Sequence, residues 1–171
     1  MRQNVKSKKT RRFGTFFCIL RHMRRATIVR KHKTVSLFYA SAIYDAAFAA
    51  RVVRALNKSS PSVEAYIRTG QTLSGKVAKC HTGELLVNVQ VPMTYPRALV
   101  RGWGTLFFDS IQSAATFALF HEVGHAIFGK DQENATDVWA IAIQTDFNLV
   151  PPRVRERKPR KPRPRPTRQE D

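Results

Sequence analysis

Residues 119–140 read LFHEVGHAIFGKDQENATDVWA, and this stretch decides both the expected fold and the candidate site. It contains HEVGH, in which His121, Glu122 and His125 have the spacing HExxH. Side chains four residues apart lie on one face of a helix, so two imidazoles can bind one metal ion there. A glutamate beside them can take a proton from a water molecule on the metal. The pattern predicts a metal centre with Glu122 as general base, against the alternative of a polar helix with two unremarkable histidines.

A zinc site needs a third protein ligand, and a catalytic site leaves the fourth position to water. No histidine follows His125, so that ligand is a carboxylate or comes from upstream. The link after the first helix is short, which favours an antiparallel helix pair. In that register Glu133 lies near His125, and Asp137 returns towards His121. Glu133 is the first candidate for the ligand, Asp137 and Asp131 are alternatives, and Asp137 can instead orient a ligand histidine.

HEVGH followed by ENATD, residues 133–137, resembles the gluzincin branch of the zincin metallopeptidases. The whole stretch is most similar to the compact ImmA/IrrE-like metallopeptidases of bacteria and phages. The resemblance implies a Zn²⁺ cofactor and a protein or peptide substrate. It also implies roles for five residues: zinc ligands His121, His125 and Glu133, the water-activating Glu122, and the orienting Asp137.

This chain departs from the gluzincin pattern in its second helix. Ala135 and Thr136 replace the second Glu and the Ala that the ImmA/IrrE-like helix carries. The spacing from His125 to Glu133 is also short for a gluzincin. The departures affect the identity of the third ligand more than the class of enzyme.

Hydrophobic periodicity outside this stretch predicts further elements of an α+β fold. Strands are expected at residues 34–40, 84–91 and 105–109, with weak, mixed signals at residues 64–83. Helices are expected at residues 42–56 after a Ser41 cap, at residues 110–128 after an Asp109 cap, and at residues 131–146. The last helix would bury Ala135, Val138, Trp139, Ala142 and Ile143. We expect a zincin-like fold, in which a small, mostly antiparallel sheet packs on helices and the HExxH helix precedes a second ligand-bearing helix.

The formal net charge of +18 lies in the two ends of the 171-residue chain. Residues 1–33 hold 12 Lys/Arg and no acid, residues 151–171 hold nine basic and three acidic groups, and residues 34–150 are neutral. We therefore expect a poorly ordered basic leader at 1–33, a metallopeptidase domain at 34–150 and a disordered Pro/Arg-rich tail at 151–171. Translation starting at Met23 would make the leader an artefact.

The basic ends suggest non-specific binding to nucleic acid phosphates. The competing hypothesis is therefore a non-catalytic, nucleic-acid-associated protein whose zincin-like core is degenerate or holds a structural metal. No apolar run is long enough for a transmembrane helix, and two cysteines are too few for a disulfide framework, so a cytoplasmic setting is expected.

Three minor expectations concern the rest of the site. The resemblance implies an edge strand that pairs with an extended substrate, and residues 84–91 are its candidate, against the alternative that this strand is central in the sheet. Tyr95 is a candidate for stabilising the oxyanion, although a structural role is favoured for it. Cys80 with His81 is expected to be a buried thiol beside a surface histidine rather than a metal site.

Overall fold

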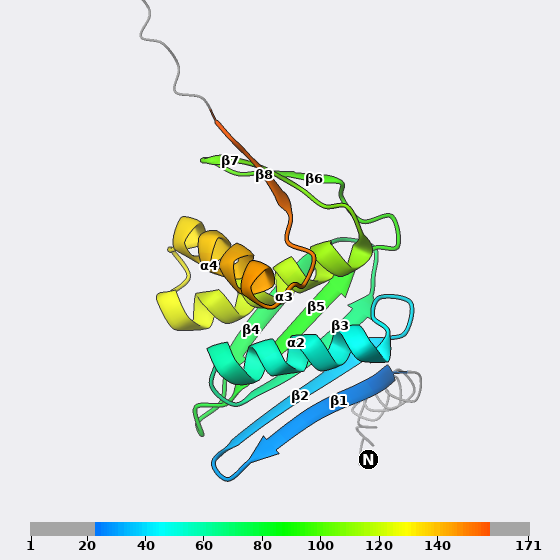
Figure 1. The fold of residues 1–171 in the computed structure, drawn as a ribbon. Helices are drawn as coiled ribbons and strands as arrows, with labels where there is room; N and C mark the ends of the chain where they lie inside the picture. The colour runs from blue at the N-terminus through cyan, green and yellow to red at the C-terminus, as the bar shows by residue number, and fades with distance from the viewer. Residues whose placement is uncertain (1–22, 158–171) are drawn as a thin grey trace, which may run out of the picture.

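The structure is a computed structural model that describes residues 23–157. Eleven elements follow one another along this part of the chain, as Figure 1 shows. They are β1 (Met23–Arg30), β2 (Lys33–Ala40), α2 (Ala46–Ser59), β3 (Val63–Thr69), β4 (Ser74–Lys79), β5 (Leu85–Val91), β6 (Ala98–Val100), β7 (Gly104–Phe107), α3 (Ile111–Phe128), α4 (Glu133–Asp146) and β8 (Arg153–Glu156).

The strands form two sheets, one of five strands in the order β1-β2-β3-β5-β4 and one of three in the order β6-β7-β8. The outer pairs of the large sheet and both pairs of the small sheet are antiparallel. Strand β3 pairs in parallel with both of its neighbours, β2 and β5. The expected α+β class is therefore confirmed, and the described pairings are mostly antiparallel, with a parallel centre that the sequence did not indicate.

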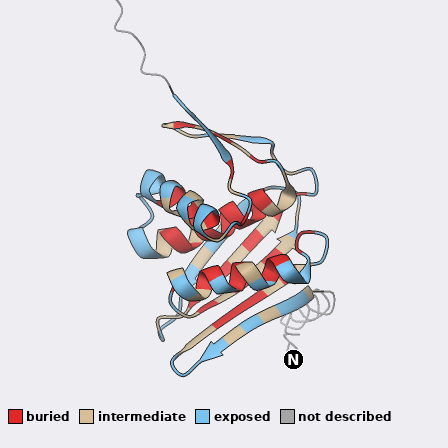
Figure 2. Cartoon of the chain, viewed as in Figure 1, coloured by how far each residue is buried: buried red, intermediate tan, exposed pale blue. Residues whose placement is uncertain are grey.

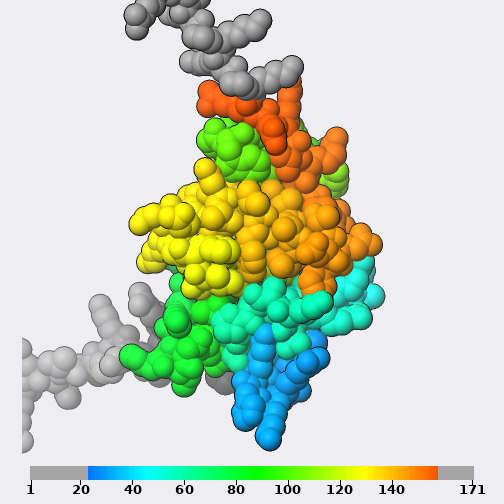
Figure 3. Space-filling model, turned by 60° about the vertical axis from the view of Figure 1, so that its left-hand side comes forward, coloured from blue at the N-terminus to red at the C-terminus, as the bar shows by residue number. Residues whose placement is uncertain are grey.

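Two helices cover one face of the large sheet: α2 packs on β1 and β2, and α3 packs on β4 and β5 (Figure 1). Alternate residues of β3 and β5 are buried beneath them, as the period of a strand requires (Figure 2). Helix α4 packs on α3 rather than on the sheet. In the space-filling view it forms a band on the surface between the small sheet and α2 (Figure 3).

Helix α3 lies between the large sheet and α4, and eleven of its 18 residues are buried. Ser110 caps its first turn, because the Ser110 side chain accepts a hydrogen bond from the Ser113 N–H at 3.1 Å. Gly129 ends it with φ of 100°, a conformation that glycine adopts without a steric penalty. The chain then turns directly into α4, which gives the antiparallel helix pair that the short link predicts.

The caps and buried faces of the helices differ from the expectation. Helix α2 begins after Asp45, whose carboxylate accepts from the Phe48 N–H at 2.7 Å, so Ser41 is not its cap. Asp109 is not the cap of α3 and instead pairs with Arg153, with the closest N–O distance at 2.8 Å. In α4 the fully buried residues are Thr136, Asp137, Ala140 and Gln144. Of the expected apolar stripe, Trp139 and Ile143 are partly buried against the core, whereas Ala135, Val138 and Ala142 are exposed.

The boundaries of the expected ordered domain were also wrong at both ends. Strand β1 lies inside the expected leader, and β8 lies inside the expected tail. Residues 64–83, whose periodicity is weak and mixed, form most of two strands, β3 and β4. Residues 1–22 and 158–171 lie outside the described residues. Across residues 23–157, no helix combines the length and the apolar character that crossing a membrane requires.

Candidate metal centre

The α3–α4 hairpin brings three potential metal ligands together. His121 and His125 lie one turn apart on α3, and Glu133 is the first residue of α4. The two Nε2 atoms are 2.9 Å apart. One carboxylate oxygen of Glu133 lies 3.5 Å from His121 Nε2, and the other lies 3.4 Å from His125 Nε2. Three ligand atoms of suitable chemistry thus converge on one point.

These separations fit a zinc ion. With zinc–ligand bonds of about 2.0–2.1 Å, atoms at the corners of a tetrahedron lie about 3.3 Å from one another. The distances of 3.5 and 3.4 Å are close to that value but involve the two different oxygens of Glu133, and the 2.9 Å between the imidazole nitrogens is short of it. With one ligand atom taken from each residue, the three atoms lie within 4.8 Å of one another. Two imidazoles and one carboxylate are a set of ligands that would suit zinc.

The second nitrogen of each imidazole faces an acceptor. His125 Nδ1 is 3.3 Å from the Gly129 carbonyl oxygen, because the glycine that ends α3 turns this carbonyl back to the ring. His121 Nδ1 is 2.9 Å from an oxygen of Asp137, although the two are not aligned as a hydrogen bond. A hydrogen on Nδ1 of each ring would leave the Nε2 lone pair for a metal, which is the tautomer that a metal ligand needs.

Asp137 is fully buried and interacts with two residues outside the helix pair. Trp103 Nε1 donates to its carboxylate at 3.2 Å, and Arg101 Nε lies 3.1 Å from the same oxygen. Arg101 also places Nη1 3.8 Å from Glu133. These contacts fix the position of the buried carboxylate beside His121. Arg101 and Trp103 were missed in the sequence, because no spacing relates the loop between β6 and β7 to the HExxH helix.

Glu122 lies on the side of α3 that faces β4. A Cβ added at Gly75 of β4 would come within 2.3 Å of Glu122 Cγ, so the strand backbone lies directly against this side chain. Burial raises the pKa of the Glu122 carboxyl above its usual value, while the charges of His121 and His125 act in the opposite direction. A raised pKa makes the carboxylate a stronger base near neutral pH.

The group is open to solvent on one side. The imidazole side chains of His121 and His125 are each 11% exposed, whereas the Glu133 side chain is 53% exposed. Glu133 also stands in the first turn of α4, where the positive end of the helix dipole favours a carboxylate.

The other residues singled out from the sequence lie apart from this group. Asp131 is exposed in the link and is absent from the set of converging ligands. Tyr95 is half-buried and packs against the core. Cys80 is exposed rather than buried, which corrects that expectation.

The expected substrate strand is also corrected. Strand β5, which occupies residues 85–91, is an inner strand between β3 and β4. The edge strand beside α3 is β4, which lies in the region with weak, mixed periodicity.

Comparisons of the chain with models of protein families, with curated proteins and with solved structures found no match.

Proposed function

We propose that this protein is a zinc-dependent metallopeptidase in which His121, His125 and Glu133 hold the metal. The observation that carries the proposal is the convergence of the two Nε2 atoms and the Glu133 carboxylate within 3.5 Å. An accidental HExxH sequence on a helix would not require a third ligand on a different helix, nor an acceptor at each Nδ1. A zinc ion held by these residues would polarise a peptide carbonyl and acidify its water ligand.

Glu122 is the proton carrier of this mechanism. Its carboxylate lies beside the ligand histidines and is partly removed from solvent, so it can accept a proton from the attacking water. The same group then donates that proton to the amine that leaves when the peptide bond breaks. Asp137 acts through His121, because it orients the imidazole and does not reach the substrate.

Strand β4 provides the surface for an extended peptide. It is the edge of the large sheet, and its Gly75 lies against Glu122. A substrate that pairs with the free edge of β4 would run past the general base. Such pairing uses backbone hydrogen bonds and demands little of the side chains of the substrate.

A Glu122→Gln variant tests the mechanism. Glutamine has the same shape but cannot accept and return a proton, so we expect peptide hydrolysis to fall by about 10²–10⁴-fold. Zinc bound per chain, measured by mass spectrometry, should stay the same. Undiminished hydrolysis in a variant that binds zinc would refute the mechanism. Zinc binding by a wild-type chain that cleaves no peptide would instead favour the non-catalytic hypothesis.

A further inference from the structure

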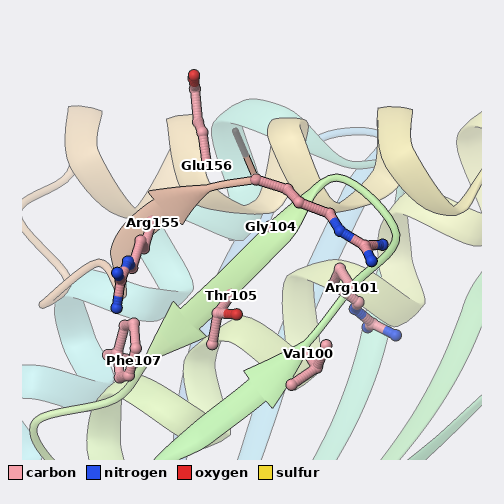
Figure 4. A pocket seen from close by; sticks show the side chains of 8 residues that line it. Val100, Arg101, Gly104, Thr105, Phe107, Arg155 and Glu156 are labelled. Carbon is pink, nitrogen blue, oxygen red and sulfur yellow. The ribbon is translucent and has the colours of Figure 1, made fainter. Parts of the chain in front are cut away.

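The small sheet carries a basic cleft, and one of its lining residues, Arg101, also lies beside Glu133 and Asp137. The cleft has a volume of about 580 Å³, and Arg101, Val100, Thr105, Arg155 and Arg157 are among its lining residues. Figure 4 shows Arg155 and Arg101 at its two ends, with Thr105 and Val100 between them. Nothing in the proposed mechanism uses Arg155 or Arg157.

The cleft has an unbalanced charge. Three arginines line it against one acid, Glu156, whose side chain points away from Thr105 and Val100 in Figure 4. Arg101 is held by Asp137, but neither Arg155 nor Arg157 has an ion-pair partner among residues 23–157. Two exposed guanidinium groups are thus free to bind an anion, and their planar donors suit a carboxylate.

The backbone places these arginines firmly. Strand β8 pairs with β7 so that Arg155 lies opposite Thr105. A Cβ added at Gly104 would come within 2.7 Å of the Arg155 carbonyl oxygen, so the two strands are in close contact. The Arg157 N–H donates to the Trp103 carbonyl at 3.1 Å, which ties the end of β8 to the loop beside the metal centre.

Arg101 connects the cleft to the metal centre. It lines the cleft and also lies 3.8 Å from Glu133, the most exposed member of the metal group. A peptide bound in the cleft would therefore continue past Glu133. Val100, which is 78% exposed, adds an apolar contact that suits a peptide side chain better than a phosphate backbone.

We propose that this cleft binds acidic side chains of the substrate, so that the enzyme selects peptides with Asp or Glu near the cleaved bond. The inference rests on the proposed function for its role in catalysis. The binding itself depends only on Arg155, Arg157 and the shape of the small sheet.

Fluorescence anisotropy of the full chain tests the cleft, with Glu122→Gln present throughout so that no probe is cleaved. The probes are a glutamate-rich peptide, the same peptide with glutamine at each glutamate position, and oligothymidylate. The variant Arg155→Gln/Arg157→Gln is compared with Arg24→Gln/Arg30→Gln, which removes the same charge from exposed positions of β1. We expect the cleft variant to bind the glutamate peptide about fivefold more weakly than the control variant, with weaker binding at high salt.

Three results would overturn the inference: equal losses in the two variants, equal affinity for the glutamate and glutamine peptides, or tighter binding of oligothymidylate that only the cleft variant loses. The last result would identify a phosphate-binding surface. Zinc content and hydrolysis by the chain with Glu122 intact are measured separately. If the chain binds the glutamate peptide selectively but cleaves nothing, the proposed function is refuted and the cleft remains a binding site for acidic peptides. If the chain cleaves peptides without that selectivity, only the proposed role of the cleft is refuted.

Discussion

Gly75 is the residue at which the sheet and the proposed general base meet. Its missing side chain makes room for Glu122, since an added Cβ would lie 2.3 Å from Cγ and 2.4 Å from Oε1 of that residue. We expect Gly75→Ala to displace the Glu122 carboxylate and to reduce hydrolysis at least tenfold, because a misplacement of about 1 Å in a catalytic group costs up to about a hundredfold.

The control for this prediction is Gly102→Ala, because a Cβ at Gly102 would meet nothing within 4 Å. Steady-state kinetics and zinc content are measured for both variants. Zinc should remain bound in both, since Gly75 does not touch a proposed ligand. Full activity in Gly75→Ala would show that the position of Glu122 against β4 is unimportant.

At the scale of elements, the position of Glu133 depends on how closely α4 packs on α3. Gly124 permits this packing, because a Cβ there would come within 2.8 Å of Thr136 Cγ2. We expect Gly124→Ala to destabilise the protein by about 1–3 kcal/mol through overpacking, partly offset by about 1 kcal/mol from the better helix propensity of alanine. Urea unfolding measures the change.

Thr136→Ala supplies the compensating change, since it removes the methyl group that Gly124→Ala would meet. Among residues 23–157 the Thr136 hydroxyl has no hydrogen-bond partner, so Thr136→Ala breaks no such bond there. The double variant should therefore be more stable than the sum of the two single changes predicts. Simple additivity would contradict the close packing of the two helices at this point.

The sequence predicted the elements with strong periodicity and missed those without it. Strand β5 and helix α3 were found because their apolar residues are continuous or alternate clearly. The buried face of α4 was missed because three of its four buried residues, Thr136, Asp137 and Gln144, are polar. A face that packs beside a cluster of charged groups does not carry an apolar stripe.

The edge strands were missed for a related reason. All four residues of β8 are exposed, and β1 carries exposed arginines at both ends, on either side of the half-buried Ala26 and Ile28. Because of this basic composition, the residues of both strands were assigned to the basic ends of the chain. The HExxH spacing could indicate the histidines and Glu122, and the short link could indicate Glu133. Arg101 and Trp103 reach Asp137 only through the tertiary fold, so no local pattern indicates them.

In the whole molecule, residues of α2 and of α3, the helix that carries the two histidines, belong to one hydrophobic core. The hydroxyls of Tyr44, just before α2, and Thr116, on α3, form a buried hydrogen bond of 2.8 Å across this core. We expect Tyr44→Phe to lower the free energy of unfolding by about 1–3 kcal/mol, because the Thr116 hydroxyl loses its partner.

The double variant Tyr44→Phe/Thr116→Val distinguishes the contribution of the hydrogen bond to stability from the contribution of packing. Replacing both partners with apolar groups of similar shape removes the unsatisfied hydroxyl, so the double variant should lose less stability than the two single variants together. Thermal unfolding followed by circular dichroism gives the comparison. Zinc content should not change in any of these variants, and a parallel loss of zinc would show that the core couples to the metal centre.

The central claim is that a carboxylate on α4 completes a zinc site built on α3. Its most direct test is the zinc bound per chain, measured by mass spectrometry on wild type, Glu133→Ala and the control Asp131→Ala. We predict about one zinc ion per wild-type chain, the same in Asp131→Ala, and loss of zinc in Glu133→Ala with the fold retained. Zinc retained in Glu133→Ala, or absent from folded wild type supplied with zinc, would contradict the account.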